Sequence, residues 1–132
     1  NYFHDTGNGV GHFLCVHEGS HQIRMNHMPT TLRPGMTVTN EPGIYKAGRH
    51  GIRTENTLLI VPAMESEFGS FMKFEPLTLC PIDKEAIVTD MLTDEEINWF
   101  NEYHKMVYSR LSPQLNKEEQ EWLKEKTSPL KR

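Results

Sequence analysis

The chain changes character near residue 80, and this change constrains its fold more than any other feature. Residues 1–80 are rich in Gly, Pro, Thr and β-branched residues, which favour strands and turns. Residues 90–132 are rich in Glu, Lys, Leu and Trp, with hydrophobic residues at helical spacing. We therefore predict an α+β architecture, with a strand-rich part over 1–80 followed by a helical extension over 81–132.

The overall composition is that of a soluble globular domain. Of 132 residues, 36% are hydrophobic and 24% charged, and the net charge is −4. This mildly acidic balance argues against nucleic acid or an anionic membrane as a partner, and no apolar run is long enough to span a bilayer. The first residues, NYFHDTG, hold neither a signal peptide nor an initiator Met. We expect the chain to be a piece of a longer protein.

The two cysteines, Cys15 and Cys80, each lie in an apolar stretch. Buried free thiols in a cytoplasmic protein are therefore expected, in preference to a disulfide.

Four segments are predicted to form strands or to lead into them: 10–16, 36–40, 51–61 and 71–82. Turn signals at Pro34-Gly35 and Pro42-Gly43 flank the second of these segments. Pro76 weakens the last one, because proline cannot donate a ladder hydrogen bond.

Two helices are expected in the tail. Thr93 and Glu96 form a capping-box pattern, and Ser112-Pro113 ends the helix that follows. Asn116 and Glu119 suggest a second helix start. Apolar or aromatic residues recur at helical spacing in the first helix: Ile97, Phe100, Tyr103 or His104, Val107 and Leu111.

Two carboxylates stand out in the strand-rich part. Glu41 lies just before the Pro42-Gly43 turn, and alternation in the segment 51–61 places Glu55 on the same face as Arg53. Two such strands in a hairpin-like arrangement would bring both carboxylates to one point. For any single Glu an exposed surface position is the commoner case. Glu55, however, is expected to be half-buried and paired with Arg53.

Histidines are concentrated near the amino-terminal end. Five of the seven fall within the first 27 residues: His4, His12, His17, His21 and His27. Imidazole is a common metal ligand and proton carrier, although a lone histidine more often has neither role. No standard zinc spacing is present, and GNGVG lacks the strand–helix unit that a dinucleotide site requires.

Four blocks taken together resemble a known family: HDTGNGVGHFLCVHEG, GMTVTNEPGIY, GIRTENTLLIV and the tail FEPLTLCPI with INWFNEYHKMVY and EWLKEKTSPL. They resemble, in order and over nearly the whole chain, the C-terminal part of the long-chain aminopeptidase P (Xaa-Pro aminopeptidase) family. This resemblance implies the C-terminal half of a pita-bread domain over 1–80, with antiparallel strands. It further implies that the helical extension, 81–132, packs on the same unit or on a partner subunit.

The same resemblance implies an enzyme that removes an N-terminal residue preceding proline, using two divalent metal ions. Manganese is the expected metal, with zinc or cobalt as alternatives. The implied partners are peptides with proline at the second position, the missing N-terminal half of the same protein and a second copy of the parent in a homodimer.

Site residues follow from the resemblance by position. Glu41 and Glu55 match metal ligands, Glu55 as the bridging one and Glu41 as the one that takes a proton from the attacking water. Asn8 stands where the family has a histidine ligand, and Asp5 stands where it has a glycine. Two further aspartate ligands would lie upstream of residue 1.

Three other residues match supporting roles in the family. His17 corresponds to a histidine that donates a hydrogen bond to the developing oxyanion, and His4 to one that lines the substrate site. Arg53 corresponds to an arginine that orients Glu55.

These matches lead to one expectation and two alternatives. Because Asn8 replaces an imidazole and the aspartates are absent, this chain alone is expected to bind catalytic metal weakly or not at all and to have no peptidase activity. One alternative is a non-catalytic pita-bread homologue that binds peptides or proteins, which Asn8 and Asp5 favour. The other is a plain interaction domain whose helical tail docks on a partner chain. Retention of the whole set favours the enzyme family, since a protein that only binds has no physical need for it: Glu41, Glu55, His17, His4 and Arg53.

Overall fold

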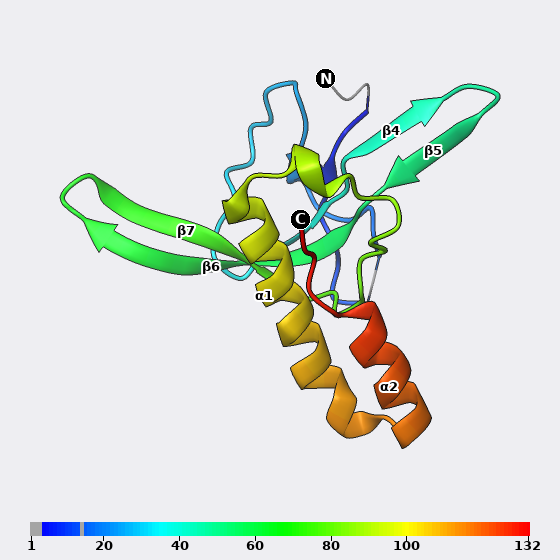
Figure 1. Ribbon diagram of the computed structural model, residues 1–132. Coiled ribbons are helices and arrows are strands. Elements are labelled where there is room, and N and C mark those ends of the chain that lie inside the picture. Colours follow the sequence, from blue (N-terminus) through cyan, green and yellow to red (C-terminus); the bar gives the residue numbers. More distant parts are fainter. Residues whose placement is uncertain (1–3, 14) are drawn as a thin grey trace. The chain divides into compact units, whose positions relative to one another are not determined.

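The computed structural model describes residues 4–13 and 15–132 (Figure 1). It divides into two compact units, Asn1–Thr78 and Leu79–Arg132. Among its described residues, the first unit contains seven strands: β1 (Gly7–Asn8), β2 (Gln22–Ile23), β3 (Thr37–Asn40), β4 (Gly43–Lys46), β5 (His50–Arg53), β6 (Asn56–Ser66) and β7 (Gly69–Pro76). The second contains two α-helices and two short 3-10 helices: η1 (Thr89–Met91), α1 (Asp94–Leu111), η2 (Ser112–Gln114) and α2 (Lys117–Lys126).

The described strands of the first unit pair in antiparallel fashion. They form the two-stranded sheets β1-β2 and β4-β5 and the three-stranded sheet β3-β6-β7, whose long β6–β7 hairpin is evident in Figure 1. Val38, Leu58 and Ile60 are buried at the centre of the three-stranded sheet. Each such side chain contributes on the order of 1.5–3 kcal/mol through burial. This small core anchors β3, the strand that leads directly to Glu41.

The prediction of one continuous strand over 51–61 is wrong. β5 ends at Arg53 and β6 begins at Asn56, because the chain passes here from pairing with β4 to pairing with β3. The alternation that placed Arg53 and Glu55 on one face therefore does not apply. Since Asn40 pairs with Asn56 and Gly43 pairs with Arg53, the linkers 41–42 and 54–55 lie opposite each other.

Two other predicted strands also differ from the structure. Among its described residues, segment 10–16 has turns instead of a strand, and Leu14 lies outside the description. Hydrogen bonds from Gly11 N–H to the Cys15 carbonyl and from Glu18 N–H to the Gly9 carbonyl fold this segment back on itself. The last predicted strand, 71–82, is shorter at its end than expected, since β7 ends at Pro76. That position is consistent with the missing N–H of proline.

The Pro42-Gly43 signal does not make a hairpin turn between its neighbouring strands. Gly43 is the first residue of β4, which pairs with β5, whereas β3 before it pairs with β6. The linker 41–42 therefore carries the chain from one sheet to another.

Both helix starts were correctly predicted from the sequence. Thr93 and Glu96 form a reciprocal capping box at α1, and Asn116 and Glu119 form one at α2. Each box satisfies backbone N–H groups that have no partner inside the helix. The buried face of α1 consists of Phe100, Tyr103, His104 and Val107. Tyr103 and Val107 form the core of this unit with Leu123 of α2.

The cysteines are free, but the prediction that they are buried is wrong. Cys15 and Cys80 are both exposed. Cys15 lies in the folded-back turn region and Cys80 beyond the end of β7, so neither apolar stretch forms a strand that would cover its thiol. Within the described residues, no helix combines the length and hydrophobicity needed to cross a membrane.

Candidate active site

The candidate site is built on the two facing linkers of the first unit. The Thr54 N–H lies 3.4 Å from the Pro42 carbonyl oxygen, and the Glu41 N–H donates to the Thr6 carbonyl at 2.6 Å. Glu41 is therefore fixed by its backbone to the segment that leads into β1. Its exposed fraction is only 7%.

Three side chains donate hydrogen bonds to the buried Glu41 carboxylate. Asn8 Nδ2 lies 2.6 Å and Thr39 Oγ1 2.8 Å from Oε1, and Arg53 Nη1 lies 2.8 Å from Oε2. A buried carboxylate is costly unless such donors replace its water. These three donors come from β1, β3 and β5, so the arrangement depends on all three sheets of the unit.

Arg53 connects the two carboxylates. Its Nη1 atom is 2.8 Å from Glu41 Oε2 and 3.9 Å from Glu55 Oε2. Its Nε donates to Tyr45 Oη at 2.7 Å. The hydrogen bond to Tyr45 raises the pKa of Arg53 above its ordinary value, and the charges of Tyr45, Glu41 and Glu55 add to this in that order. The structure thus gives Arg53 a closer contact with Glu41 than with Glu55, the residue that it was expected to orient.

Glu55 is less enclosed than Glu41. Its side chain is 42% exposed, against 9% for the side chain of Glu41. The expected pairing with Arg53 is present, but Glu55 is more open than the predicted half-buried position. The break between β5 and β6 explains this, because Glu55 belongs to neither strand.

Asn8 presents its amide NH2 group to Glu41. Because a carboxylate can only accept hydrogen bonds, the NH2 end of the side chain must face it. Oδ1 points to the other side, 3.4 Å from Gln22 Nε2. The side chain at the position expected to hold a metal ligand is therefore used as a hydrogen-bond donor.

His4 lies at the edge of this cluster through Tyr45. The two rings make an edge-on contact with centroids 5.3 Å apart, and His4 Nδ1 lies 2.5 Å from the Asp5 carbonyl oxygen. Gly43 and Gly51 make room for the Tyr45 ring. A Cβ at Gly43 would lie 2.3 Å from Tyr45 Oη, and one at Gly51 would lie 2.4 Å from its Cδ1.

His17 is not part of the cluster in the structure. It occupies an exposed turn, and no hydrogen bond joins its ring to Glu41 or Glu55 in the described part of the chain. Its expected contact with an oxyanion stays a prediction.

Sequence reasoning grouped Thr39 with Glu41 on one face but named neither Thr39 nor Tyr45 as a site residue. Thr39 is 2% exposed and bonds both the Asn8 backbone and the Glu41 side chain. The signal for Thr39 is its position two residues before Glu41, which places both on one face of an extended segment. Tyr45 could have been found from the glycines that lie opposite its ring in the β4–β5 hairpin.

The described residues do not by themselves fit a pair of divalent metal ions. They contain no group of three or more His, Cys, Asp or Glu side chains arranged to hold a metal. Glu41 and Glu55 are suitable oxygen donors for a hard cation, but the neighbouring Asn8 offers a donor NH2 group where a lone pair would be needed. This chain therefore supplies only part of such a ligand set.

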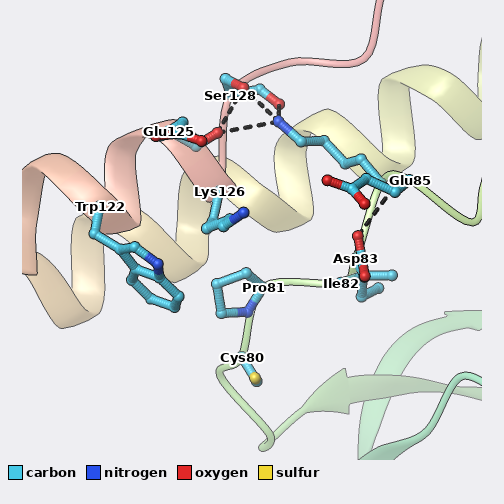
Figure 2. Close-up of a pocket in the computed structure, with 10 residues that line it drawn as sticks. Cys80, Pro81, Ile82, Asp83, Glu85, Trp122, Glu125, Lys126 and Ser128 are labelled. Atoms are coloured by element: carbon cyan, nitrogen blue, oxygen red, sulfur yellow. Dashed lines mark hydrogen bonds between the residues drawn. The ribbon is translucent and has the colours of Figure 1, made fainter.

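A second concave site lies in the helical unit, lined by residues of segment 80–85 and by the end of α2 (Figure 2). Lys84 Nζ donates to the Glu125 carbonyl at 3.1 Å, to the Ser128 carbonyl at 2.9 Å and to Ser128 Oγ. The Glu125 carbonyl belongs to the last turn of α2 and also accepts from the Ser128 N–H at 3.1 Å, and Ser128 lies just beyond the helix. The ammonium group of Lys84 therefore holds segment 80–85 against the C-terminal end of α2, a structural role.

Comparisons with known proteins find matches in both units of the chain. Residues 1–62 match the model of metallopeptidase family M24, and residues 70–130 match the model of the C-terminal region of peptidase_M24. A probable Xaa-Pro aminopeptidase P of Coprinopsis cinerea is 43% identical over 136 residues, which cover 98% of this chain and 22% of that protein. Aminopeptidase P1 of Arabidopsis thaliana is 45% identical over 135 residues, covering 98% and 21%.

A solved structure supports the same assignment. The X-prolyl aminopeptidase of Caenorhabditis elegans, described as a cytosolic enzyme with a di-nuclear active site, matches with a TM-score of 0.85 and 37% identity. The match covers 96% of this chain and 22% of that chain. It confirms the predicted fold class, the C-terminal half of a pita-bread domain with antiparallel strands followed by a helical tail. The chain spans about a fifth of the length of these relatives, and it belongs to metallopeptidase family M24.

Proposed function

We propose that this chain is part of a dinuclear metal-dependent aminopeptidase that releases an N-terminal residue preceding proline. The observation that supports the proposal is the convergence of Glu41 and Glu55 on Arg53 from the two facing linkers, next to Asn8. Grouping two carboxylates around one cation requires the whole fold of the first unit. A protein that only binds other chains has no physical need for that grouping.

The proposal extends to the partners and the setting of the longer protein. Its substrates are peptides with proline at the second position, and its cofactors are two divalent ions, with manganese preferred. The strand-rich part, 1–80, belongs to the catalytic domain, and the helical extension, 81–132, packs on the same unit or on the second copy of a homodimer. The cytoplasm is the proposed location, in keeping with the cytosolic enzyme of Caenorhabditis elegans.

In this proposal the described residues have distinct roles. Glu41 accepts a proton from the attacking water, and Arg53 fixes the positions of Glu41 and Glu55 through charge-assisted contacts. His17 donates a hydrogen bond to the oxyanion that forms on the peptide carbonyl. His4, next to Tyr45, lines the substrate site.

We further propose that the chain has no peptidase activity in isolation. The two carboxylates form an incomplete ligand set, and the Asn8 NH2 group is bonded to Glu41 Oε1. The direct measurement is a calorimetric titration of the chain with manganese at neutral pH. Binding weaker than micromolar is expected, and micromolar or tighter binding contradicts the proposal.

The decisive experiment uses the longer protein that contains this chain, with Asn8 and with Asn8→His, in an Xaa-Pro cleavage assay with added manganese. Imidazole offers the lone pair that the amide NH2 group lacks, so the histidine form should be at least about 10²-fold more active. Equal activity in both forms would show that Asn8 does not occupy a ligand position. Absence of activity in both would overturn the proposed function.

A second candidate function is a non-catalytic pita-bread homologue that binds peptides or proteins. The observation that favours it is the complete hydrogen bonding of Glu41 by Asn8, Thr39 and Arg53, which gives a stable cluster without a metal. A longer protein that binds proline-containing peptides but cleaves none, with either residue at position 8, would support this alternative.

A further inference from the structure

Thr39 occupies the centre of the hydrogen bonds that hold Glu41. Its hydroxyl oxygen accepts from the Asn8 backbone N–H at 2.8 Å, and the hydroxyl donates to Glu41 Oε1 at 2.8 Å. A hydroxyl has a single proton, so the shorter contact identifies Glu41 as its acceptor, in preference to the Asn8 carbonyl at 3.5 Å. One side chain therefore connects the backbone of β1 to the candidate catalytic carboxylate.

The environment of Thr39 leaves this hydroxyl little freedom. The residue is 2% exposed, and its backbone pairs with Thr57 in the three-stranded sheet. Gly7 of β1 approaches so closely that a Cβ there would lie 2.3 Å from the Thr39 carbonyl oxygen. A β-branched side chain in a strand is also restricted at χ1. The donor is thus held rigidly before any substrate arrives.

The geometry assigns Thr39 as a positioning residue for Glu41, one that fixes the orientation of its carboxylate relative to Asn8. This inference rests on the proposed function for the role of Glu41, but the hydrogen bonds that support it do not. Arg53 holds the other oxygen of the carboxylate, Oε2. Oε1 is thus held by Thr39 and Asn8 and Oε2 by Arg53, so the carboxylate is fixed at both oxygens.

Thr37 provides a matched control on the same strand. It lies on the same face of β3, and its hydroxyl also bonds the neighbouring segment, donating to the Val10 carbonyl at 2.5 Å. That bond involves no carboxylate. Thr37→Val and Thr39→Val each remove one hydroxyl of β3 with little change in shape, and only the second removes a donor to Glu41.

The test measures kcat and KM in the form of the longer protein that cleaves peptides, with Asn8 or with Asn8→His. Thr39→Val should lower kcat by roughly 10–100-fold, the usual effect of losing a partner that orients a functional carboxylate, and leave KM nearly unchanged. Thr39→Ser should restore kcat to within about threefold, since it keeps the hydroxyl. Thr37→Val should likewise stay within about threefold, because no donor to Glu41 is lost. An equal loss of kcat in Thr37→Val and Thr39→Val would overturn the inference.

A second measurement decides the inference without activity. In the 132-residue chain, the folding equilibrium constant is measured for Thr39→Val, Glu41→Met and the double variant. Thr39→Val removes the acceptor of the Asn8 N–H in both backgrounds. The constant should nevertheless fall about threefold or more further when Glu41 is present than when it is Met, because only Glu41 accepts from the Thr39 hydroxyl. Equal losses in both backgrounds would overturn the inference even if the enzyme is active. If no form of the longer protein cleaves peptides, the proposed function is wrong. The comparison of the single and double variants then decides by itself whether Thr39 holds Glu41.

Discussion

Glu41 in the first unit and His104 in the second are both buried polar side chains, and the chain surrounds them in opposite ways. Glu41 is 7% exposed and accepts hydrogen bonds from three side chains, including the cation Arg53. His104 is fully buried, and its Nε2 accepts one hydrogen bond, from the Ile82 N–H at 2.9 Å. Burial first, and the charge of Lys84 second, lower the pKa of His104.

This difference indicates a functional role for the buried group of the first unit and a structural role for that of the second. The first unit stabilises a charge, which requires donors from several segments and is useful for proton transfer or ligand binding. The second unit buries a neutral ring that fixes segment 80–85 to α1 and packs against Phe100. We therefore expect substitutions of Glu41 to lower kcat most strongly, and substitutions in the helical unit to lower the free energy of unfolding.

The largest effect is expected for Glu41→Gln in the longer protein. The substitution keeps the shape but removes the charge that accepts a proton, so kcat should fall by about 10³-fold or more. A peptidase assay against Glu75→Gln, a matched change of an exposed carboxylate on β7, provides the control. Comparable activity of the two variants would show that the charge of Glu41 has no role in catalysis.

Leu123→Ala should be the most destabilising of the changes considered in the helical unit. Leu123 is 1% exposed and packs in the core with Tyr103 and Val107. Its truncation should cost about 2–5 kcal/mol through lost burial and the cavity left behind. Denaturant unfolding measures this, with the neighbouring Trp122→Ala as a control, since Trp122 is 55% exposed. An equal loss of unfolding free energy in Trp122→Ala would contradict the assignment of Leu123 to the core of this unit.

The free energy of unfolding should depend on pH through the protonation of His104. Its pKa is lowered in the folded state from the ordinary 6.5, so the unfolded chain binds the proton more readily. Stability is then complete above about pH 6.5 and falls as the pH drops below it, by at most about 1.4 kcal/mol per pH unit. Unfolding of the chain at pH 7.5 and 5.5 tests this prediction. His104→Gln keeps an acceptor for the Ile82 N–H and should remove most of the difference, whereas an unchanged difference would point to other groups.

The smallest effect is expected at the helix caps. Thr93→Ala removes the side chain that accepts from the Glu96 N–H, and it should lower the stability by about 1 kcal/mol. Thr93→Ser, which retains the oxygen, is the control and should stay close to the parent. Thermal unfolding distinguishes the two variants, and an equal loss in both would mean that the capping oxygen contributes nothing. Peptidase activity of the longer protein should not change in either.

Sequence patterns predicted the helical unit far better than the strand unit. A capping box involves residues three apart, and the buried face of α1 follows from helical spacing, so both are local. The break at Thr54 and Glu55 has no comparable local signal, because it arises where the chain changes pairing partners between β4 and β3. The predicted strand at 10–16 failed for a related reason. Its apolar residues suggested a strand, but its backbone groups bond within the turn.

In the candidate site, too, the sequence predicted some features and the tertiary structure was needed for others. Residue types and their resemblance to a family predicted Glu41, Glu55, Arg53 and Asn8 as neighbours, and the structure brings these four side chains together. The pairing of Arg53 with Glu55 was predicted, but the closer partners of Glu41 were not. Whether Arg53 lies closer to Glu41 or to Glu55 depends on the register of β4 against β5, and the role of Thr39 depends on the approach of β1 to β3.

The sequence by itself determined the α+β class, the two helix starts and the family to which the chain belongs. These features depend on residue type and on spacing within a few positions, where backbone geometry alone sets which side chains share a face. Only the tertiary structure decided that the Asn8 NH2 group faces Glu41 and that Thr39 connects the two. The contacts of Asn8 with Thr39 and Glu41 join residues more than thirty positions apart, and their geometry is fixed by sheet register and close packing instead of by local preference.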